Sequence, residues 1–180
     1  KWDRIIGWLV FAIATITYVM TVEPTTSLWD CGEYIATAYK LEIGHPPGAP
    51  LFLLIANLFS NFAGGDVTKV AYYINIMSAL CSSFTILFLF WTITAFTKKM
   101  ALKSVTELSK SHVIMILASG AVGALCYTFS DSFWFSAVEG EVYAMSSFFT
   151  ALVFWAMIKW EEGFGQPRND KWIVLIAFLI

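Results

Sequence analysis

Charge is scarce in this chain of 180 residues: 13% are Asp, Glu, Lys or Arg, whereas 58% are hydrophobic. A water-soluble domain rarely has this balance, which is typical of a membrane protein. No basic patch alternates with aromatic residues, so nucleic acid is not an expected partner. The three cysteines have neither the spacing of a metal site nor the even number of a disulfide framework.

Several enzyme motifs are also missing. The sequence has no P-loop, no GxGxxG, no HExxH and no nucleophile elbow, so the enzyme classes that these motifs mark have no support. We therefore expect no permanently bound cofactor, and the sequence predicts no metal ligand set and leaves metal dependence open.

Long apolar runs dominate what is present. Four of them are long enough to approach the ~30 Å hydrocarbon core at 1.5 Å per helical residue, and a fifth begins at Trp172. They predict membrane spans at about 5–22, 67–97, 112–129, 141–160 and 172–180 onward, with a polar loop over 98–111 and a turn over 130–140. The chain begins without Met and ends inside an apolar run, so we expect it to be the N-terminal part of a longer protein.

Between the first two spans, the sequence predicts two shorter helices that lie in the membrane interface, at about 27–42 and 49–63. In the first, polar residues recur at three- and four-residue steps on one face, with apolar residues opposite, including Leu41. The predicted fold class is thus an all-α polytopic membrane protein with two interfacial helices in its first outer loop.

The distribution of basic residues predicts the orientation. With the N-terminus in the cytoplasm, the outer segments hold only Lys40 and Lys69, and all other basic residues fall on the cytoplasmic side. Carboxylates gather on the outer side, which would be the periplasm of a bacterium or the lumen of the endoplasmic reticulum.

Asp30 and Glu33 are the first candidates for chemistry. Their i, i+3 spacing places both carboxylates on one face of the first interfacial helix. A fixed carboxylate facing a reaction chamber is what a general base requires. The alternative is helix capping, because Ser27-x-x-Asp30 and Asp30-x-x-Glu33 both resemble a capping box.

His45 lies in the break His45-Pro46-Pro47-Gly48 and is a candidate for contacting a phosphate or a sugar hydroxyl. The simpler interpretation is a solvated residue in a helix break. Glu139, Glu141 and Tyr143 lie near the start of the fourth span, where carboxylates are costly and often functional. The alternatives are a complement to the helix dipole for the acids and an aromatic belt for Tyr143.

Two weaker candidates are Asp66, which is most simply a helix N-cap, and Asn75.

Together, Asp30-x-Gly32-Glu33, the string Gly44-His45-Pro46-Pro47-Gly48-x-Pro50-Leu51-Phe52 and the later Glu141-Val142-Tyr143 resemble one family. It is the protein O-mannosyltransferase-like family of the GT-C glycosyltransferase superfamily. The resemblance implies a GT-C-like helical bundle, of which residues 1–180 would be the N-terminal part of the catalytic membrane domain.

The resemblance also implies an activity. A polyprenyl-phosphate sugar, mannose or another hexose, would be the donor, and a Ser or Thr hydroxyl of an exported protein the acceptor, with inversion at the anomeric carbon. Asp30 would be the general base. Glu33 and Glu141 would assist it or bind sugar hydroxyls with Glu139 and Tyr143, and His45 would contact the phosphate.

Three other functions compete with this one. A transporter or lipid flippase would place its acids near the membrane midplane. A scaffold without catalysis would tolerate the loss of Asp30. A related enzyme would use a glycolipid acceptor, and nothing in the residues decides between protein and lipid acceptors.

Overall fold

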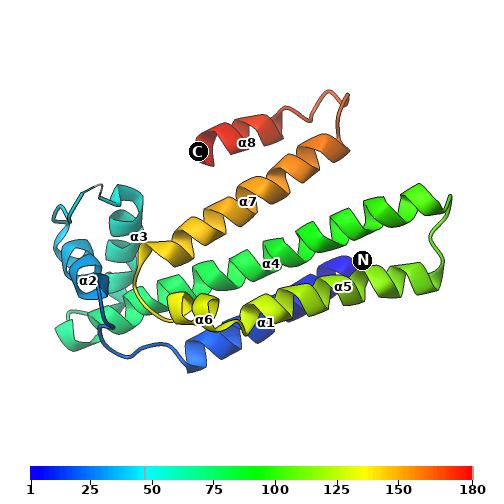
Figure 1. Cartoon of the computed structure of the whole chain (residues 1–180). Helices are drawn as coiled ribbons and strands as arrows, with labels where there is room; N and C mark the ends of the chain where they lie inside the picture. The colour runs from blue at the N-terminus through cyan, green and yellow to red at the C-terminus, as the bar shows by residue number, and fades with distance from the viewer. Residues whose placement is uncertain (47, 180) are drawn as a thin grey trace.

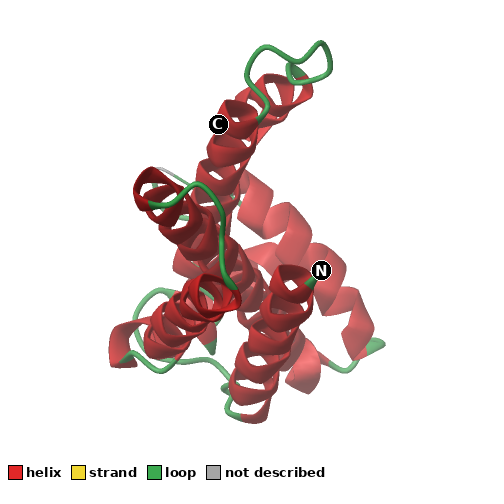
Figure 2. Cartoon of the chain, turned by 90° about the vertical axis from the view of Figure 1, so that its right-hand side faces the viewer, coloured by secondary structure: helices red, strands yellow, loops and turns green. Residues whose placement is uncertain are grey.

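The computed structural model of the chain describes residues 1–46 and 48–179, and over these residues it contains helices and no strand (Figures 1 and 2). The α-helices are α1 (Trp2–Met20), α2 (Cys31–Lys40), α3 (Pro50–Ser60), α4 (Val70–Ser104), α5 (Lys110–Thr128), α6 (Asp131–Ala137), α7 (Val142–Glu162) and α8 (Lys171–Leu179), and the 3₁₀ turns are η1 (Asn61–Ala63) and η2 (Val67–Lys69). The prediction of an all-α protein is confirmed.

Four segments are long and apolar enough to cross a membrane. They are Trp2–Met20, Val67–Ser104, Lys110–Thr128 and Val142–Glu162. A single water-soluble core has no use for four such helices, because much of their apolar surface stays exposed. The protein is therefore a polytopic membrane protein, as predicted.

The long helix α4 is the centre of the bundle and packs against α1, α5 and α7. Its 35 residues extend about 52 Å, well beyond a ~30 Å hydrocarbon core. Figure 1 shows it running from the α2–α3 end to the opposite end of the molecule. Helix α5 approaches closely, because a Cβ at Gly120 would lie 2.5 Å from Thr94 Cγ2.

Two apolar clusters hold the bundle together. One joins α2 and α3 to the start of α4 through Cys31, Ile35, Phe52 and Ile74. The other joins α1, α4, α5 and α6, and within it the buried Tyr18 hydroxyl donates to the carbonyl oxygen of Thr128 at 2.9 Å. The first cluster thus packs the α2–α3 hairpin against the start of α4.

Some helix bounds differ from the predicted ranges. Residues 131–137, expected in a turn, form α6, because Phe133 and Ala137 lie one helical turn apart and both bury against the bundle. Helix α4 continues to Ser104 through residues expected in a loop, since Lys, Met, Ala and Leu are good helix formers. Leu41, expected on the apolar face of the helix, is its left-handed C-cap and is 57% exposed.

Helix α8 corresponds to the start of the predicted fifth span. Its nine residues extend only about 13 Å, so the described part does not itself cross a membrane. Ile180, the end of that predicted span, and Pro47, in the predicted His-Pro-Pro-Gly break, lie outside the described residues.

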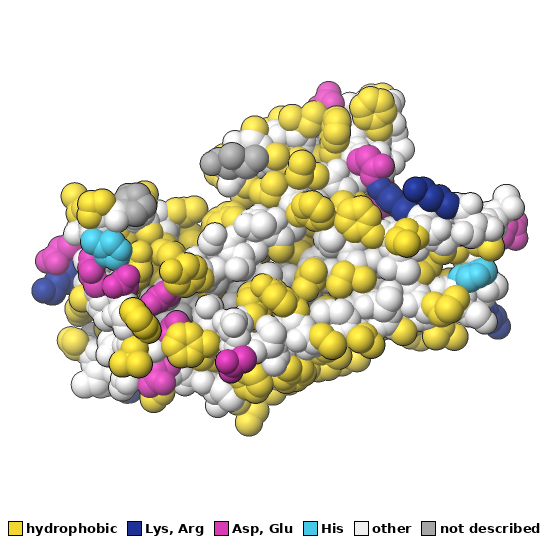
Figure 3. Space-filling view, viewed as in Figure 1, with side chains coloured by type: hydrophobic (Ala, Val, Ile, Leu, Met, Phe, Trp, Pro, Cys, Tyr) yellow, Lys and Arg dark blue, Asp and Glu magenta, His cyan; other side chains and the backbone are white. Residues whose placement is uncertain are grey.

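The two ends of the bundle differ in charge (Figure 3). We call the end that carries α2, α3, α6 and the start of α7 the acidic end, because acidic side chains gather there. The basic end carries the start of α1, the end of α4, the start of α5 and the end of α7. In Figure 3 a patch of Lys and Arg side chains lies near this second end, and a largely uncharged surface separates the two.

Candidate functional site

The acidic end brings together Asp30, Glu33 and His45. The Glu33 carboxylate accepts a hydrogen bond from the His45 backbone N–H at 2.7 Å through Oε1, and its Oε2 lies 3.1 Å from His45 Nδ1. The other ring nitrogen, Nε2, lies 3.9 Å from Asp30 Oδ2. One imidazole therefore bridges the two carboxylates that the helix spacing had placed on one face.

Helix capping does not account for Asp30. It occupies the N-cap position of α2, but within the described chain its side chain makes no capping hydrogen bond. The residue before it, Trp29, has a left-handed backbone (φ 61°) and is 87% exposed, an unusual conformation for a bulky side chain. The start of α2 is thus marked by the left-handed backbone of Trp29 and not by an N-cap hydrogen bond from Asp30.

Glu33 and Asp30 differ in how they are held. The hydrogen bond from the His45 backbone, the bond to its ring and the ring's charge together lower the pKa of Glu33. Asp30 makes only the longer contact to His45, and 63% of its side-chain surface is exposed. Glu33 is therefore the carboxylate that holds the His45 backbone and ring, and Asp30 is the more exposed of the two.

The ring of Tyr34 packs beside the ring of His45. Its ring centroid lies 5.7 Å from that of His45 and 5.6 Å from that of Phe52 on α3. Burial raises the pKa of the Tyr34 hydroxyl, and the charges of Asp30 and Glu141 act in the same direction. No sequence signal singles out Tyr34, since an aromatic side chain beside an acid is common.

Asn75 ties the segment between α1 and α2 to α4. The side chain is fully buried, and its Nδ2 donates to the carbonyl oxygens of Glu23 at 2.7 Å and Thr25 at 2.9 Å. The Glu23 amide donates in turn to the carbonyl of Val138 at 3.0 Å. In the sequence, Asn75 stands out as a lone amide inside an apolar stretch. In the structure, it anchors the segment that leads to Asp30.

Glu139 and Glu141 are buried, at 3% and 6% exposed, beneath the start of α2. Glu141 holds the N-cap position of α7, but its side chain makes no capping bond within the described residues. Glu139 Oε2 is buried without a hydrogen-bond partner there. Gly140 allows this tight turn, because a Cβ on it would lie 2.8 Å from Asn75 Oδ1.

Burial raises the pKa of both acids. Glu23 adds to the effect at Glu139, and Glu139 and Asp30 add to it at Glu141. Burial also raises the pKa of the Cys31 thiol above them. These effects place Glu141 within electrostatic reach of Asp30, although neither carboxylate of the turn is open to a ligand in this conformation.

Two candidates remain, Tyr143 and Asp66. Tyr143 is 60% exposed in the first turn of α7. Asp66 is an N-cap, as predicted: its side chain accepts from the Thr68 amide at 3.1 Å and pairs with Lys69 at 3.1 Å. Over the described residues no cluster of three or more His, Cys, Asp or Glu side chains could hold a metal ion.

This geometry suits proton transfer. A carboxylate with one open side lies beside an imidazole whose ring is held by a second carboxylate, the arrangement that fixes the direction of a base. The tautomer and charge of His45 decide whether it presents a donor to Asp30 or to an incoming anion.

Comparison with known proteins identifies the family. The model of the protein O-mannosyl-transferase TMEM260 N-terminal domain matches residues 30–180, so the match starts at Asp30 and covers most of the chain. The chain belongs to this family. The resemblance to the protein O-mannosyltransferase-like family, which the sequence motifs indicated, is thus confirmed.

Two curated relatives agree with this assignment. Protein O-mannosyl-transferase tmem260 of Dictyostelium discoideum is 30% identical over 145 residues, 81% of this chain and 16% of the relative. Protein O-mannosyl-transferase TMEM260 of Mus musculus is 30% identical over 170 residues, 94% of this chain and 21% of the relative. The chain thus spans about a fifth or less of their length. No solved structure matches the chain.

Proposed function

We infer that the protein containing this TMEM260-type domain transfers mannose from a polyprenyl-phosphate donor to a Ser or Thr hydroxyl of an exported protein. The observation that carries the proposal is the bridge of His45 between Asp30 and Glu33. The names of the relatives, both protein O-mannosyl-transferases, support the same class of reaction.

The reaction assigns one role to each group. The acceptor oxygen attacks the anomeric carbon as the bond from that carbon to the phosphate oxygen breaks, which inverts the centre. Asp30 takes the hydroxyl proton, and the electron pair leaves with the lipid phosphate. Glu33 positions the loop through His45, and the second ring nitrogen of His45 offers a donor for the phosphate's developing charge.

The buried acids have a proposed role that requires the turn to open. Glu141, with Glu139 and Tyr143, would bind sugar hydroxyls once a donor separates α2 from the start of α7. The raised pKa values support this assignment, because a carboxyl group that is protonated more easily is also a hydrogen-bond donor to a sugar.

The proposed topology places the N-terminus in the cytoplasm and the acidic end in the periplasm or the lumen. The separation of the charges supports it, since basic residues favour the cytoplasmic side. The acids lie at a helix end and not halfway along the spans, which favours surface chemistry over a transport pathway.

The decisive experiment compares wild type with Asp30→Asn and Glu42→Gln in the full-length protein, using polyprenyl-phosphate mannose and a Ser/Thr-rich polypeptide. Glu42 is an exposed acid of the same loop, 4.0 Å from Lys40, so its change is a matched control. We expect the control to keep the wild-type rate of mannose transfer. Asp30→Asn should lower that rate at least roughly a hundredfold, which is the lower end of the range for a general base.

If Asp30→Asn transfers as well as Glu42→Gln, Asp30 is not the base. Transfer to a glycolipid in place of the polypeptide would assign the acceptor differently. Transfer from GDP-mannose without the lipid would overturn the proposed donor.

A further inference from the structure

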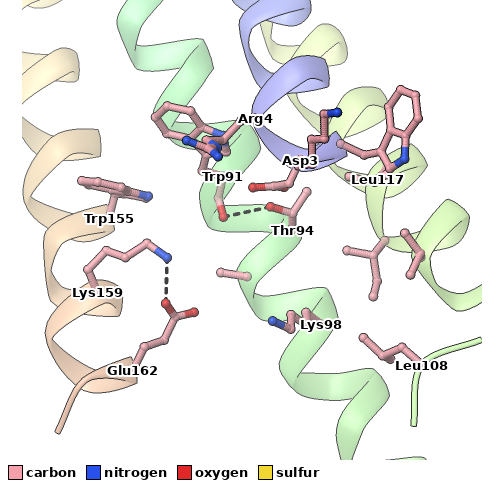
Figure 4. A pocket seen from close by; sticks show the side chains of 15 residues that line it. Asp3, Arg4, Trp91, Thr94, Lys98, Leu108, Leu117, Trp155, Lys159 and Glu162 are labelled. Atoms are coloured by element: carbon pink, nitrogen blue, oxygen red, sulfur yellow. Dashed lines mark hydrogen bonds and ion pairs between the residues drawn. The ribbon is translucent and has the colours of Figure 1, made fainter. Parts of the chain in front are cut away.

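A cavity of about 610 Å³ opens at the basic end, between α1, α4, α5 and α7 (Figure 4). Trp91 of α4 and Trp155 of α7 form its inner wall. Arg4 of α1, Lys98 of α4 and Lys159 of α7 lie around it. In Figure 1, α7 diverges from α4 toward this end, and the space between them is part of the cavity.

The cations of the cavity are only partly neutralised. Lys159 pairs with Glu162 at 2.7 Å, as Figure 4 shows. Among the described residues, Lys1, Arg4 and Lys98 have no carboxylate within salt-bridge distance. Asp3 is the acid that lines the cavity beside Glu162. Three unpaired cations that face one space attract an anion.

The cavity is charged at its rim and aromatic further in, as at the boundary between lipid headgroups and hydrocarbon. Lys98 is seven residues beyond Trp91 on α4, which places its Cα about 10 Å further from the middle of the bundle. Arg4 lies in the first turn of α1, at the same end. The charged rim and the aromatic inner wall thus match a ligand with an anionic head and a hydrocarbon body.

The sugar donor of the proposed function does not fit this place. Along α4, Val70 and Lys98 are separated by about 42 Å, so the cavity and the Asp30–His45 site lie at opposite membrane surfaces. The occupant belongs to the lipid leaflet at the basic end, and this inference stands apart from the catalytic one.

We propose that this cavity binds an anionic glycerophospholipid, with Arg4 and Lys98 contacting its phosphate and the acyl chains lying along Trp91 and Trp155. A basic pocket between membrane helices is a known form of lipid-headgroup site. The volume lies within the range of small-molecule sites, which a lone inorganic anion would leave largely unfilled.

The test uses the full-length protein in phosphatidylcholine nanodiscs that contain a small fraction of photoactivatable phosphatidylglycerol. Labelled peptides are mapped by mass spectrometry, with unlabelled phosphatidylglycerol, phosphatidylcholine or inorganic phosphate as competitors. We expect label on the peptides around Trp91 and Trp155, and competition by phosphatidylglycerol alone.

Two variants and one control make the result specific. Arg4→Gln/Lys98→Gln should weaken competition by phosphatidylglycerol roughly thirtyfold, from the loss of two charge contacts. Ala95→Phe narrows the cavity but keeps every charge, and it should also reduce labelling. Lys103→Gln/Lys110→Gln removes two exposed lysines of the same end that do not line the cavity, and it should behave as wild type.

Three outcomes would overturn the proposal. Equal weakening in the lysine control would mean general attraction of the surface for anionic lipid. Equal competition by inorganic phosphate would mean a site for any small anion. Equal competition by phosphatidylcholine would mean ordinary contact with the bilayer.

Discussion

Asn75, which anchors the segment between α1 and α2, gives the sharpest structural prediction. Asn75→Leu keeps a side chain of similar size in a fully buried position but removes the two donors that hold Glu23 and Thr25. The loop then loses its attachment to α4, while the apolar contacts around position 75 remain.

The expected magnitude follows from the two lost bonds. A hydrogen bond between neutral groups contributes about 0.5–1.5 kcal/mol net, so the pair contributes about 1–3 kcal/mol to keeping the loop closed. With a tenfold change per 1.4 kcal/mol, local opening should become roughly five- to hundredfold more frequent.

Hydrogen–deuterium exchange of the full-length protein in nanodiscs measures this opening. The reporter is the Glu23 amide, which donates to the carbonyl of Val138 at 3.0 Å. Asn57→Leu is the matched control, because Asn57 Nδ2 also makes two such bonds, to the carbonyls of Ala38 at 2.9 Å and Tyr39 at 3.1 Å.

We expect Asn75→Leu to speed exchange in the peptide 21–27 and Asn57→Leu to speed it at the end of α2. The reasoning is refuted if Asn75→Leu leaves 21–27 unchanged. It is also refuted if both variants accelerate the same peptides, since that pattern reports general loosening of the fold.

Three further predictions concern the site. The raised pKa of Glu141 means that the folded protein holds more protons than the unfolded chain above pH 4.5, so stability falls as pH rises there. Glu141→Gln should therefore raise the unfolding temperature at pH 7 and change it little at pH 4. A variant that unfolds at a lower temperature than wild type at pH 7 would contradict this. Gly140→Ala should destabilise by about 1–3 kcal/mol through overpacking, whereas Gly32→Ala, whose Cβ meets nothing closer than 4.0 Å, should not; denaturation of both variants checks this. The contact with His45 lowers the pKa of Glu33, so the contact is present at neutral pH and is lost as pH falls below 4.5 through that lowered pKa. Exchange at the His45 amide should then accelerate more than the pH dependence of its intrinsic exchange rate accounts for. Glu33→Gln should abolish this acceleration.

The sequence by itself determined the membrane architecture. Long uncharged runs predict helices because no other element satisfies its backbone in lipid, and the four spans of the structure follow from them. It also placed Asp30 and Glu33 on one helix face, because the helical repeat relates residues three apart whatever surrounds them. The motifs of that loop were enough to indicate the family.

Only the tertiary structure decided how those residues meet. The contact of Glu33 with His45 spans 12 residues and that of Asn75 with Glu23 spans 52, so neither follows from local periodicity. The burial of Glu139 and Glu141 depends on α2 and α4 closing over the turn around Gly140, which no spacing in the sequence predicts. The cavity at the basic end likewise arises where α7 diverges from α4, because helix divergence is set by packing along the whole bundle.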